Sequence, residues 1–211
     1  MPTPPPPPPR IPVIVLAAGS SARFGTLDKL ATPIAGRPLL AWTLAALPHT
    51  LAQHDRIVVV GPGSGAPARI GAGAGCRLVR AHDAERGLRH SILAGLDAVR
   101  DEDPEVAGAV LLLGDDPLVA RLLPDVLEAA VADPTRTVAV RRSRFVPHPV
   151  YLPRATWPSR DVLSSGHDHG LRDMVAALDP TWIDGSAAPS LDVDVQADAT
   201  ELARLLAPRV D

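Results

Sequence analysis

The sequence of 211 residues has little cysteine, few aromatic residues and no excess of positive charge. Its one cysteine, Cys76, excludes an intramolecular disulfide bond and any metal site made of several cysteines, and it fits a reducing cytoplasm. With a formal net charge of −3 and 3% aromatic residues, the chain has no global basic field, so we expect no nucleic-acid partner. It also lacks an apolar run of the roughly 18 to 20 residues that a membrane span needs, so we expect neither membrane insertion nor export.

Proline dominates the start of the chain, with an unbroken run from Pro4 to Pro9. Such a run can form polyproline II but cannot donate backbone hydrogen bonds to a helix or sheet, so residues 1–10 are expected to form a disordered or extended tail. The chain is 46% hydrophobic, which is enough for one sizeable core, and it is too short for two independent ones. We therefore expect a single domain over residues 11–211.

The most informative stretch joins an apolar run to a polar loop that contains glycine. Residues 13–17 are continuously apolar and predict a buried parallel strand. The residues that follow it include glycines, hydroxyls and two cations, namely Gly19, Ser20, Ser21, Arg23, Gly25 and Lys29. Glycine lets backbone N–H groups approach an oxyanion, hydroxyls add donors, and the cations neutralise a polyphosphate. The pattern therefore indicates a phosphate-binding loop, with a merely polar surface loop as the alternative.

The spacing within this loop differs from two common phosphate-binding motifs. A P-loop places its lysine directly after the second glycine, whereas Lys29 lies four residues beyond Gly25. A dinucleotide-binding turn requires G-x-G-x-x-G, and the corresponding stretch here reads Ala17-Ala18-Gly19-Ser20. A P-loop nucleotidase and an NAD-dependent oxidoreductase are therefore both disfavoured.

Strand and helix patterns alternate along the rest of the chain, which predicts an α/β fold with a mostly parallel sheet. Strands are expected at 56–60, 76–80, 110–113 and 137–141, and helices at 39–47, 87–100, 121–132 and 197–206. Residues 61–75 are rich in glycine and alanine and are expected to form a flexible connection. A basic cluster is expected to lie in a solvated loop, and it consists of Arg141, Arg142 and Arg144.

A second polar site follows the strand expected at 110–113. This strand leads into Gly114-Asp115-Asp116-Pro117. Because the carboxyl ends of neighbouring strands in an open α/β sheet share one crevice, both aspartates are expected to face the loop that begins at Gly19. Mg²⁺ is bound by one or two carboxylates together with phosphate oxygens, so this position suits a metal–nucleotide site. The alternative is a turn in which the Asp-Pro pair caps the following helix.

The segment from Leu16 to Lys29, L-A-A-G-x-S-x-R-x-G-x-x-x-K, resembles the signature of MobA-like nucleotidyltransferases, where it holds the triphosphate of CTP or GTP. Further segments resemble the same family in the same order, and they begin at Gly87, Gly114, Pro147, Asp168 and Leu191. The resemblance implies a three-layer α/β/α sandwich with a Rossmann-like, mostly parallel central sheet, similar to nucleotide-diphospho-sugar transferases.

The resemblance also implies roles for individual residues. The implied nucleotide-binding residues are Leu16, Ala17, Ala18, Gly19, Ser20, Ser21, Arg23, Gly25, Lys29, Gly87 and Ser91. The implied catalytic residues are Arg23, Lys29 and Asp115, and the implied Mg²⁺ ligands are Asp115 with one of Asp192 and Asp194. The implied acceptor-binding residues are His148, Asp168 and Arg172. Asp116 stands where the family usually has methionine, which either adds a second ligand or adds nothing.

The function implied by the resemblance is transfer of CMP from CTP to the terminal phosphate of molybdopterin, with release of pyrophosphate. A phosphate monoester has a second pKa of about 6, so the acceptor is already largely ionised near neutral pH and needs no general base. This agrees with a sequence that offers no Ser/His/Asp or Cys/His constellation. CTP is expected rather than GTP because Ala17-Ala18-Gly19 resembles the cytidylyltransferase branch, whereas the guanylyltransferase branch usually reads A-G-G.

Three alternatives remain open at this stage. The first is a guanylyltransferase. The second is a methylerythritol phosphate cytidylyltransferase, although its D-x-A-R-P segment is absent at residues 114–117. The third is a nucleotide-binding accessory protein or chaperone for a molybdoenzyme, which would use the phosphate-binding loop without turnover.

Overall fold

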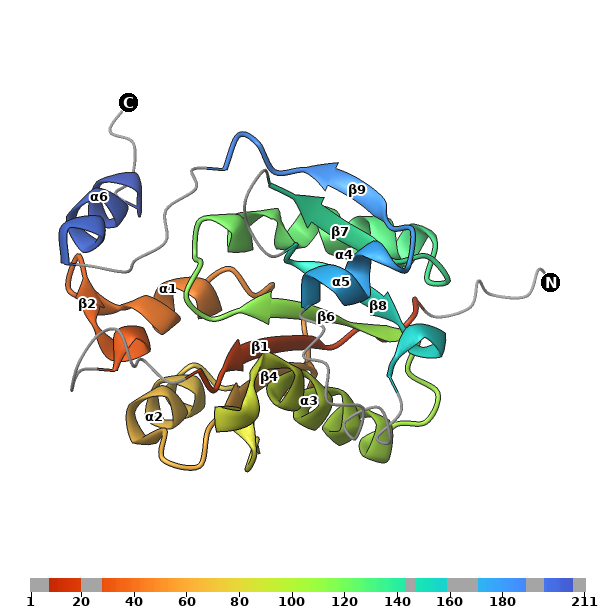
Figure 1. The fold of residues 1–211 in the computed structure, drawn as a ribbon, viewed down its shortest axis with the longest axis horizontal. Coiled ribbons are helices and arrows are strands. Elements are labelled where there is room, and N and C mark those ends of the chain that lie inside the picture. Colours follow the sequence, from red (N-terminus) through yellow and green to blue (C-terminus); the bar gives the residue numbers. More distant parts are fainter. Residues whose placement is uncertain (1–7, 20–27, 143–146, 159–170, 189–195, 207–211) are drawn as a thin grey trace.

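The computed structural model describes residues 8–19, 28–142, 147–158, 171–188 and 196–206 (Figure 1). Its centre is a seven-stranded sheet with the order β5-β4-β1-β6-β8-β7-β9. The strands are β1 Val13–Ala17, β4 Arg56–Val60, β5 Arg77–Arg80, β6 Gly108–Leu113, β7 Val138–Arg141, β8 Val150–Pro153 and β9 Thr181–Asp184. β8 runs antiparallel to its neighbours β6 and β7, and every other neighbouring pair in this sheet is parallel. The sheet is therefore mostly parallel, as the sequence predicts.

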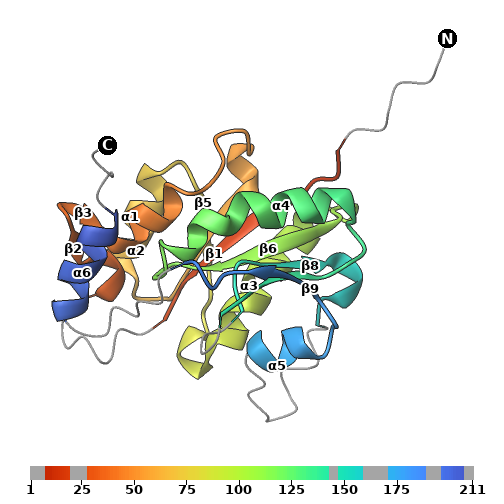
Figure 2. The ribbon, with the colours of Figure 1, turned by 90° about the horizontal axis from the view of Figure 1, so that it is seen from above.

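Helices cover both faces of the sheet. They are α1 Leu39–Leu44, α2 Gly65–Gly73, α3 Leu88–Glu102, α4 Leu123–Ala132, α5 Leu171–Ala176 and α6 Gln196–Leu206. Side chains of α1 and α4 pack in one apolar cluster, and side chains of α3 and α5 pack in a second. Figure 2 shows α4 on one side of the sheet and α3 and α5 on the other. The predicted three-layer sandwich is confirmed.

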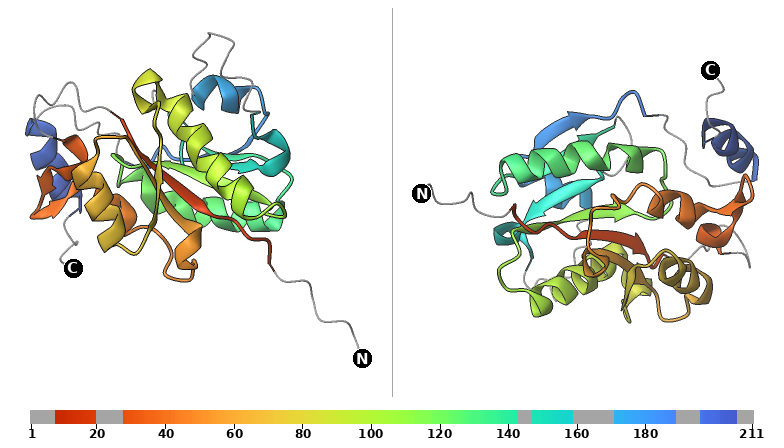
Figure 3. Two further views of the ribbon diagram at one scale, coloured as in Figure 1. Left: turned by 90° about the horizontal axis from the view of Figure 1, so that it is seen from below. Right: turned by 180° about the vertical axis from the view of Figure 1, so that it is seen from behind.

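The central strand β1 contributes to both layers because its side chains alternate between the two faces. Val13 and Val15 join the cluster that contains α1 and α4, whereas Ile14 and Leu16 join the cluster that contains α3 and α5. In Figure 3 the yellow-green α3 lies over the red β1. All five residues of β1 are buried, which explains why the sequence of this strand is apolar without a break.

The glycine-rich residues 61–75 are structured, contrary to the expectation of a flexible connection. Residues 65–73 form α2, which packs beside β4 and β5. A Cβ atom at Gly71 would lie 3.0 Å from Leu78 and 3.3 Å from Val58, so glycine at this position lets the helix approach the sheet closely. The helix is stabilised by packing on the sheet, and its low intrinsic helix propensity concealed it from sequence analysis.

Three further elements were not predicted. Strands β8 and β9 complete the sheet beyond β6, and a small hairpin forms from β2 (Pro33–Ile34) and β3 (Arg37–Pro38). α6 packs on this hairpin, where Leu202 and Ile34 share a small apolar cluster. Figure 1 places α6 and β2 at the end of the molecule toward which the β1 arrow points. The hairpin and α6 therefore flank the carboxyl edge of the parallel strands.

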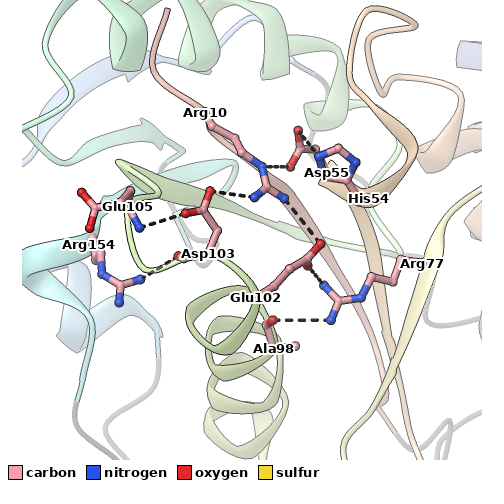
Figure 4. A network of polar contacts seen from close by, with 9 residues as sticks. All are labelled: Arg10, His54, Asp55, Arg77, Ala98, Glu102, Asp103, Glu105 and Arg154. Carbon is pink, nitrogen blue, oxygen red and sulfur yellow. Dashed lines mark hydrogen bonds and ion pairs between the residues drawn. The ribbon is translucent and has the colours of Figure 1, made fainter.

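A cluster of ion pairs centred on Arg10 joins the opposite, amino-terminal edge of the sheet (Figure 4). Arg10 donates to Asp55 and to Asp103, in each case at 2.7 Å, and these aspartates precede β4 and β6. Glu102 lies 3.9 Å from Arg10 and also pairs with Arg77. This cluster connects the starts of four strands, β1, β4, β5 and β6, so the anchoring contacts lie away from the carboxyl edge.

Two further expectations from the sequence concern the proline-rich tail and membrane-spanning segments. The proline tail falls mainly in residues 1–7, which lie outside the described part of the chain. Among the described segments, no helix combines the length and the apolar character needed to cross a bilayer.

Candidate active site

The loops that follow β1 and β6 leave the sheet side by side. The two strands are adjacent and parallel, with Leu16 paired to Leu113. The backbone N–H of Gly114 continues this pairing by donating to the carbonyl of Leu16 at 3.0 Å. The Thr43 hydroxyl on α1 donates to the carbonyl of Gly114 at 2.9 Å and fixes the start of the second loop. The carboxyl edge of the sheet therefore brings the two predicted polar sites together.

Lys29 and Asp115 meet at this edge. The Nζ atom of Lys29 lies 2.9 Å from Oδ2 of Asp115, and their side chains are 15% and 33% exposed. Asp28 caps the short helical turn that begins at Lys29, because its Oδ1 accepts a hydrogen bond from the N–H of Leu30 at 3.0 Å. Two of the three predicted catalytic residues are thus in direct contact. Arg23, the third, lies outside the described residues.

The described nucleotide-binding candidates gather around the end of β1. Leu16, Ala17 and Ala18 are buried, while Gly19 is exposed and a Cβ atom there would have no neighbour within 4 Å among the described residues. Ser20, Ser21, Arg23 and Gly25 lie outside the described residues.

The start of α3 lies at the same edge of the sheet. A Cβ atom at Gly61 would lie 3.3 Å from the carbonyl oxygen of Ala18 and 3.9 Å from Cβ of Ala84, so the ends of β1 and β4 and the turn before α3 are neighbours. Gly87 immediately precedes α3 with a φ of +129°, a conformation that favours glycine. Ser91 is buried in the first part of the helix. Gly87 and Ser91 therefore lie on an element whose beginning adjoins the β1 loop.

Asp116 has different surroundings from Asp115. Its Oδ2 forms an ion pair with Arg142 and lies 3.6 Å from Nε2 of His148, and its Oδ1 accepts a hydrogen bond from the N–H of Val119 at 3.2 Å. Burial alone raises the pKa of Asp116, but the contacts with His148 and Arg142 outweigh it, so the pKa lies below the ordinary value. Asp116 is therefore an ionised carboxylate with protein partners on both oxygens.

Arg142 was missed by sequence analysis. Its side chain is 3% exposed, so the expectation of a solvated cluster is wrong for this residue, although Arg141 is exposed. The signal that could have identified it is the aspartate at position 116, because a carboxylate at a buried strand end requires a cation or hydrogen-bond donors nearby.

Two of the three acceptor-side candidates, His148 and Arg172, lie among the described residues. His148 is 2% exposed, and its Nδ1 accepts a hydrogen bond from the N–H of Leu113 at 3.5 Å. Arg172 is exposed on α5. Asp168 lies outside the described residues, as do the metal-ligand candidates Asp192 and Asp194.

Asp115 is the predicted metal ligand that lies among the described residues. Within this part of the chain, no group of three or more His, Cys, Asp or Glu side chains could hold a metal ion. Asp115 is one-third exposed and is bonded by Lys29 through Oδ2. Since Mg²⁺ keeps several waters and is bound through one or two carboxylates and the substrate phosphates, a partly exposed carboxylate beside a phosphate loop fits such an ion.

Comparison with known proteins identifies the family to which the chain belongs. Residues 13–181 match the family model described as MobA-like NTP transferase domain. A molybdenum cofactor guanylyltransferase of Rhodopseudomonas palustris (strain BisB5) is 33% identical over 150 residues, which cover 71% of this chain and 67% of that protein. The bifunctional protein GlmU of Rhodopseudomonas palustris (strain TIE-1) is 35% identical over 114 residues, which cover 51% of this chain and 23% of GlmU. The chain thus spans about a quarter of the length of the GlmU relative.

A solved structure extends the similarity to nearly the whole chain. Rv0371c from Mycobacterium tuberculosis H37Rv superimposes with a TM-score of 0.66 and 26% sequence identity, covering 93% of this chain and 98% of that one. The family model and the guanylyltransferase relative each cover well over half of the chain, and the family model includes the loops that carry Lys29 and Asp115. The chain belongs to the MobA-like NTP transferase domain family.

Proposed function

We propose that this protein transfers CMP from CTP to the terminal phosphate of molybdopterin and releases pyrophosphate. The observation that carries the proposal is the contact between Lys29 and Asp115, 2.9 Å apart at the adjacent carboxyl ends of β1 and β6. It places a cation for phosphates and a carboxylate for a metal ion side by side, which a metal–nucleotide complex requires.

The reaction is a substitution at the α-phosphorus of the nucleotide. An oxygen of the acceptor phosphate forms a bond to the α-phosphorus, the bond to the bridging oxygen breaks, and pyrophosphate leaves with that electron pair. The acceptor phosphate is already ionised near neutral pH, so the step requires no proton transfer. Catalysis then depends on positioning the two substrates and on neutralising the leaving group.

Each proposed catalytic residue serves one of these two tasks. Lys29, together with Arg23, binds the β- and γ-phosphates. Asp115, with Asp192 or Asp194, would hold Mg²⁺, which when bound stabilises the negative charge on the triphosphate. Gly19, Gly87 and the hydroxyls of the β1 loop orient the nucleotide.

The choice between CTP and GTP depends on two observations that point in different directions. Ala17-Ala18-Gly19 favours CTP, because this form resembles the cytidylyltransferase branch of the family, whereas the guanylyltransferase branch usually reads A-G-G. The molybdenum cofactor guanylyltransferase relatives favour GTP and support a molybdopterin acceptor. GTP is therefore the second candidate donor.

Pyrophosphate release tests the proposal directly. The wild-type chain is assayed with Mg²⁺ and each of the four nucleoside triphosphates, with and without molybdopterin. We expect release that requires both CTP and molybdopterin and that is lost in Asp115→Asn. Glu105→Gln is a matched control, because this exposed carboxylate precedes the same strand, β6, at its opposite end. Nucleotide binding without release for any acceptor would refute transfer and favour a nucleotide-binding accessory protein.

A further inference from the structure

A set of buried charges lies directly behind Asp115. Asp116, the next residue, has a side chain that is 13% exposed, compared with 33% for Asp115. Its neighbours are Arg142 and His148, whose side chains are 3% and 2% exposed. Two adjacent carboxylates therefore have different environments: Asp115 lies beside Lys29 at the site, and Asp116 lies in the interior.

Both carboxylate oxygens of Asp116 have protein partners. Oδ2 contacts Arg142 and His148, and Oδ1 accepts the hydrogen bond from Val119. To bind a metal ion, Asp116 would have to give up these contacts and withdraw its charge from a buried guanidinium, which is unfavourable in the low-dielectric interior. The arrangement therefore disfavours Asp116 as a second metal ligand.

The contacts of Asp116 hold the turn after β6 at both of its ends. At the start of the turn, the N–H of Leu113 donates to Nδ1 of His148 at 3.5 Å. At the end of the turn, the N–H of Val119 donates to Asp116 at 3.2 Å. His148 connects the two ends, because its Nε2 lies 3.6 Å from Oδ2 of Asp116. Asp115 lies within this fixed turn.

The geometry points to Asp116 as a positioning residue for the nucleotidyl transfer. Through Arg142 and His148 it fixes the turn after β6, so that the carboxylate of Asp115 is held where it meets Lys29 and a divalent cation. The inference rests on the proposed function of Asp115 as a metal ligand. It also gives a physical reason for an aspartate at a position where the resemblance leads us to expect methionine: the charge compensates Arg142.

Binding of Mn²⁺ in the presence of CTP measures the positioning of Asp115 without requiring turnover. Free Mn²⁺ is followed by electron paramagnetic resonance for the full chain, for Asp115→Asn, for Asp116→Asn and for the double variant, with Glu105→Gln as control. We expect Asp115→Asn to weaken Mn²⁺ affinity at least about tenfold and Asp116→Asn about threefold. The double variant is expected to bind no more weakly than Asp115→Asn, because Asp116 acts through Asp115.

Steady-state kinetics and a conservative variant separate positioning from packing. Asp116→Asn is expected to lower kcat about tenfold while the KM for CTP changes less than about twofold. Arg142→Lys keeps a cation beside Asp116 and is expected to retain Mn²⁺ affinity within about twofold, whereas Arg142→Met is expected to lose as much as Asp116→Asn. Thermal unfolding measurements check that each variant is folded at the assay temperature. If Asp116→Asn does not fold, the comparison of the two Arg142 variants decides whether the buried charges position Asp115.

Four results would overturn the inference. Equal weakening of Mn²⁺ affinity by Asp115→Asn and Asp116→Asn, with losses that multiply in the double variant, would make Asp116 a ligand. A lower melting temperature with unchanged Mn²⁺ affinity and kcat would make it a packing residue only. Equal loss in Arg142→Lys and Arg142→Met would exclude the charge as the cause. Absence of Mn²⁺ binding by the wild type would show that Asp115 is not a metal ligand.

Mn²⁺ binding without pyrophosphate release would refute only the proposed transfer, since the comparison of Mn²⁺ affinities would still decide the role of Asp116.

Discussion

Substituting Gly95 by alanine tests how closely α3 packs on the sheet. Gly95 lies within α3, and a Cβ atom at this position would be 2.7 Å from Cγ2 of Ile14 and 3.0 Å from Cγ2 of Val59. Carbon atoms in favourable contact are about 3.5 to 4.0 Å apart, so helix and sheet would have to separate by about 1 Å. Both neighbours are fully buried β-branched residues on the central strands β1 and β4, so they have little freedom to move aside.

Two effects of opposite sign determine the size of the change. Alanine stabilises a helix relative to glycine by about 1 kcal/mol. An extra methyl group in a well-packed core costs about 1 to 3 kcal/mol, and the 2.7 Å approach to Ile14 places Gly95→Ala in the upper part of this range. The free energy of unfolding is therefore expected to fall by about 1 to 2 kcal/mol. Gly95→Val adds two more carbon atoms and is expected to lose more.

Urea unfolding followed by circular dichroism measures this loss, with Gly73→Ala as the matched control. Gly73 ends α2 and is exposed, and apart from its chain neighbours and its own helix backbone no described atom lies within 4 Å of where a Cβ would be. Its replacement is expected to leave stability unchanged or to raise it by up to about 1 kcal/mol. If Gly95→Ala were as stable as the wild type, the close contact between α3 and the sheet would be refuted. Because Gly87 and Ser91 lie at the start of α3, Gly95→Ala is also expected to raise the KM for the nucleotide.

Three further changes test the site and the opposite edge of the sheet. Lys29→Met is expected to lower kcat/KM for CTP about 100-fold in steady-state assays, and Lys29→Arg less, because in the proposed reaction the cation neutralises the triphosphate; equal losses would contradict a role for the charge. Ala18→Gly removes a methyl group at the end of β1 and is expected to raise kcat/KM for GTP relative to CTP about threefold in competition assays; an unchanged ratio would exclude Ala18 from base selection. The hydrogen bond from Arg10 lowers the pKa of Asp103 in the folded state. This contact therefore stabilises the fold at pH values above about 3.9, the pKa of aspartate in an unfolded chain, and the stabilisation is lost as the pH falls through the lower pKa of Asp103 in the folded state. In urea titrations, Arg10→Met is therefore expected to be less stable than the wild type near about pH 6, with a deficit that shrinks near about pH 2; a constant deficit would contradict this linkage.

The parts of the fold that the sequence predicts best are those with purely local signals. The strands at 13–17 and 56–60 were predicted with their observed bounds, because continuous apolar runs between polar turns are typical of central parallel strands. The two loops of the site follow from the same logic, since the carboxyl ends of adjacent parallel strands meet at one edge. The contact between Lys29 and Asp115 is the consequence.

The parts that escaped prediction depend on contacts between distant residues. α2 has a weak helical sequence, and it forms because Gly71 lets it pack against β4 and β5. The antiparallel insertion of β8 between β6 and β7 cannot be read from a short apolar segment bounded by prolines. Asp116 indicates that a cation or hydrogen-bond donors must lie nearby, but Arg142 is 26 residues away along the chain, so no local pattern shows that it is the partner.

The stabilising ion pairs of Arg10 and the candidate active site lie at opposite edges of the sheet. At the amino-terminal edge, Arg10 ties together chain segments that lead into β1, β4 and β6. At the carboxyl edge, Lys29 and Asp115 are in contact while both are partly exposed, so each compensates the other's charge when no nucleotide is bound. In the proposed reaction, a metal–nucleotide complex offers a cation to Asp115 and phosphate oxygens to Lys29, so each group exchanges one oppositely charged partner for another. Since no charge has to be left uncompensated during this exchange, the carboxyl edge can bind and release a highly charged substrate while the rest of the sheet keeps its packing.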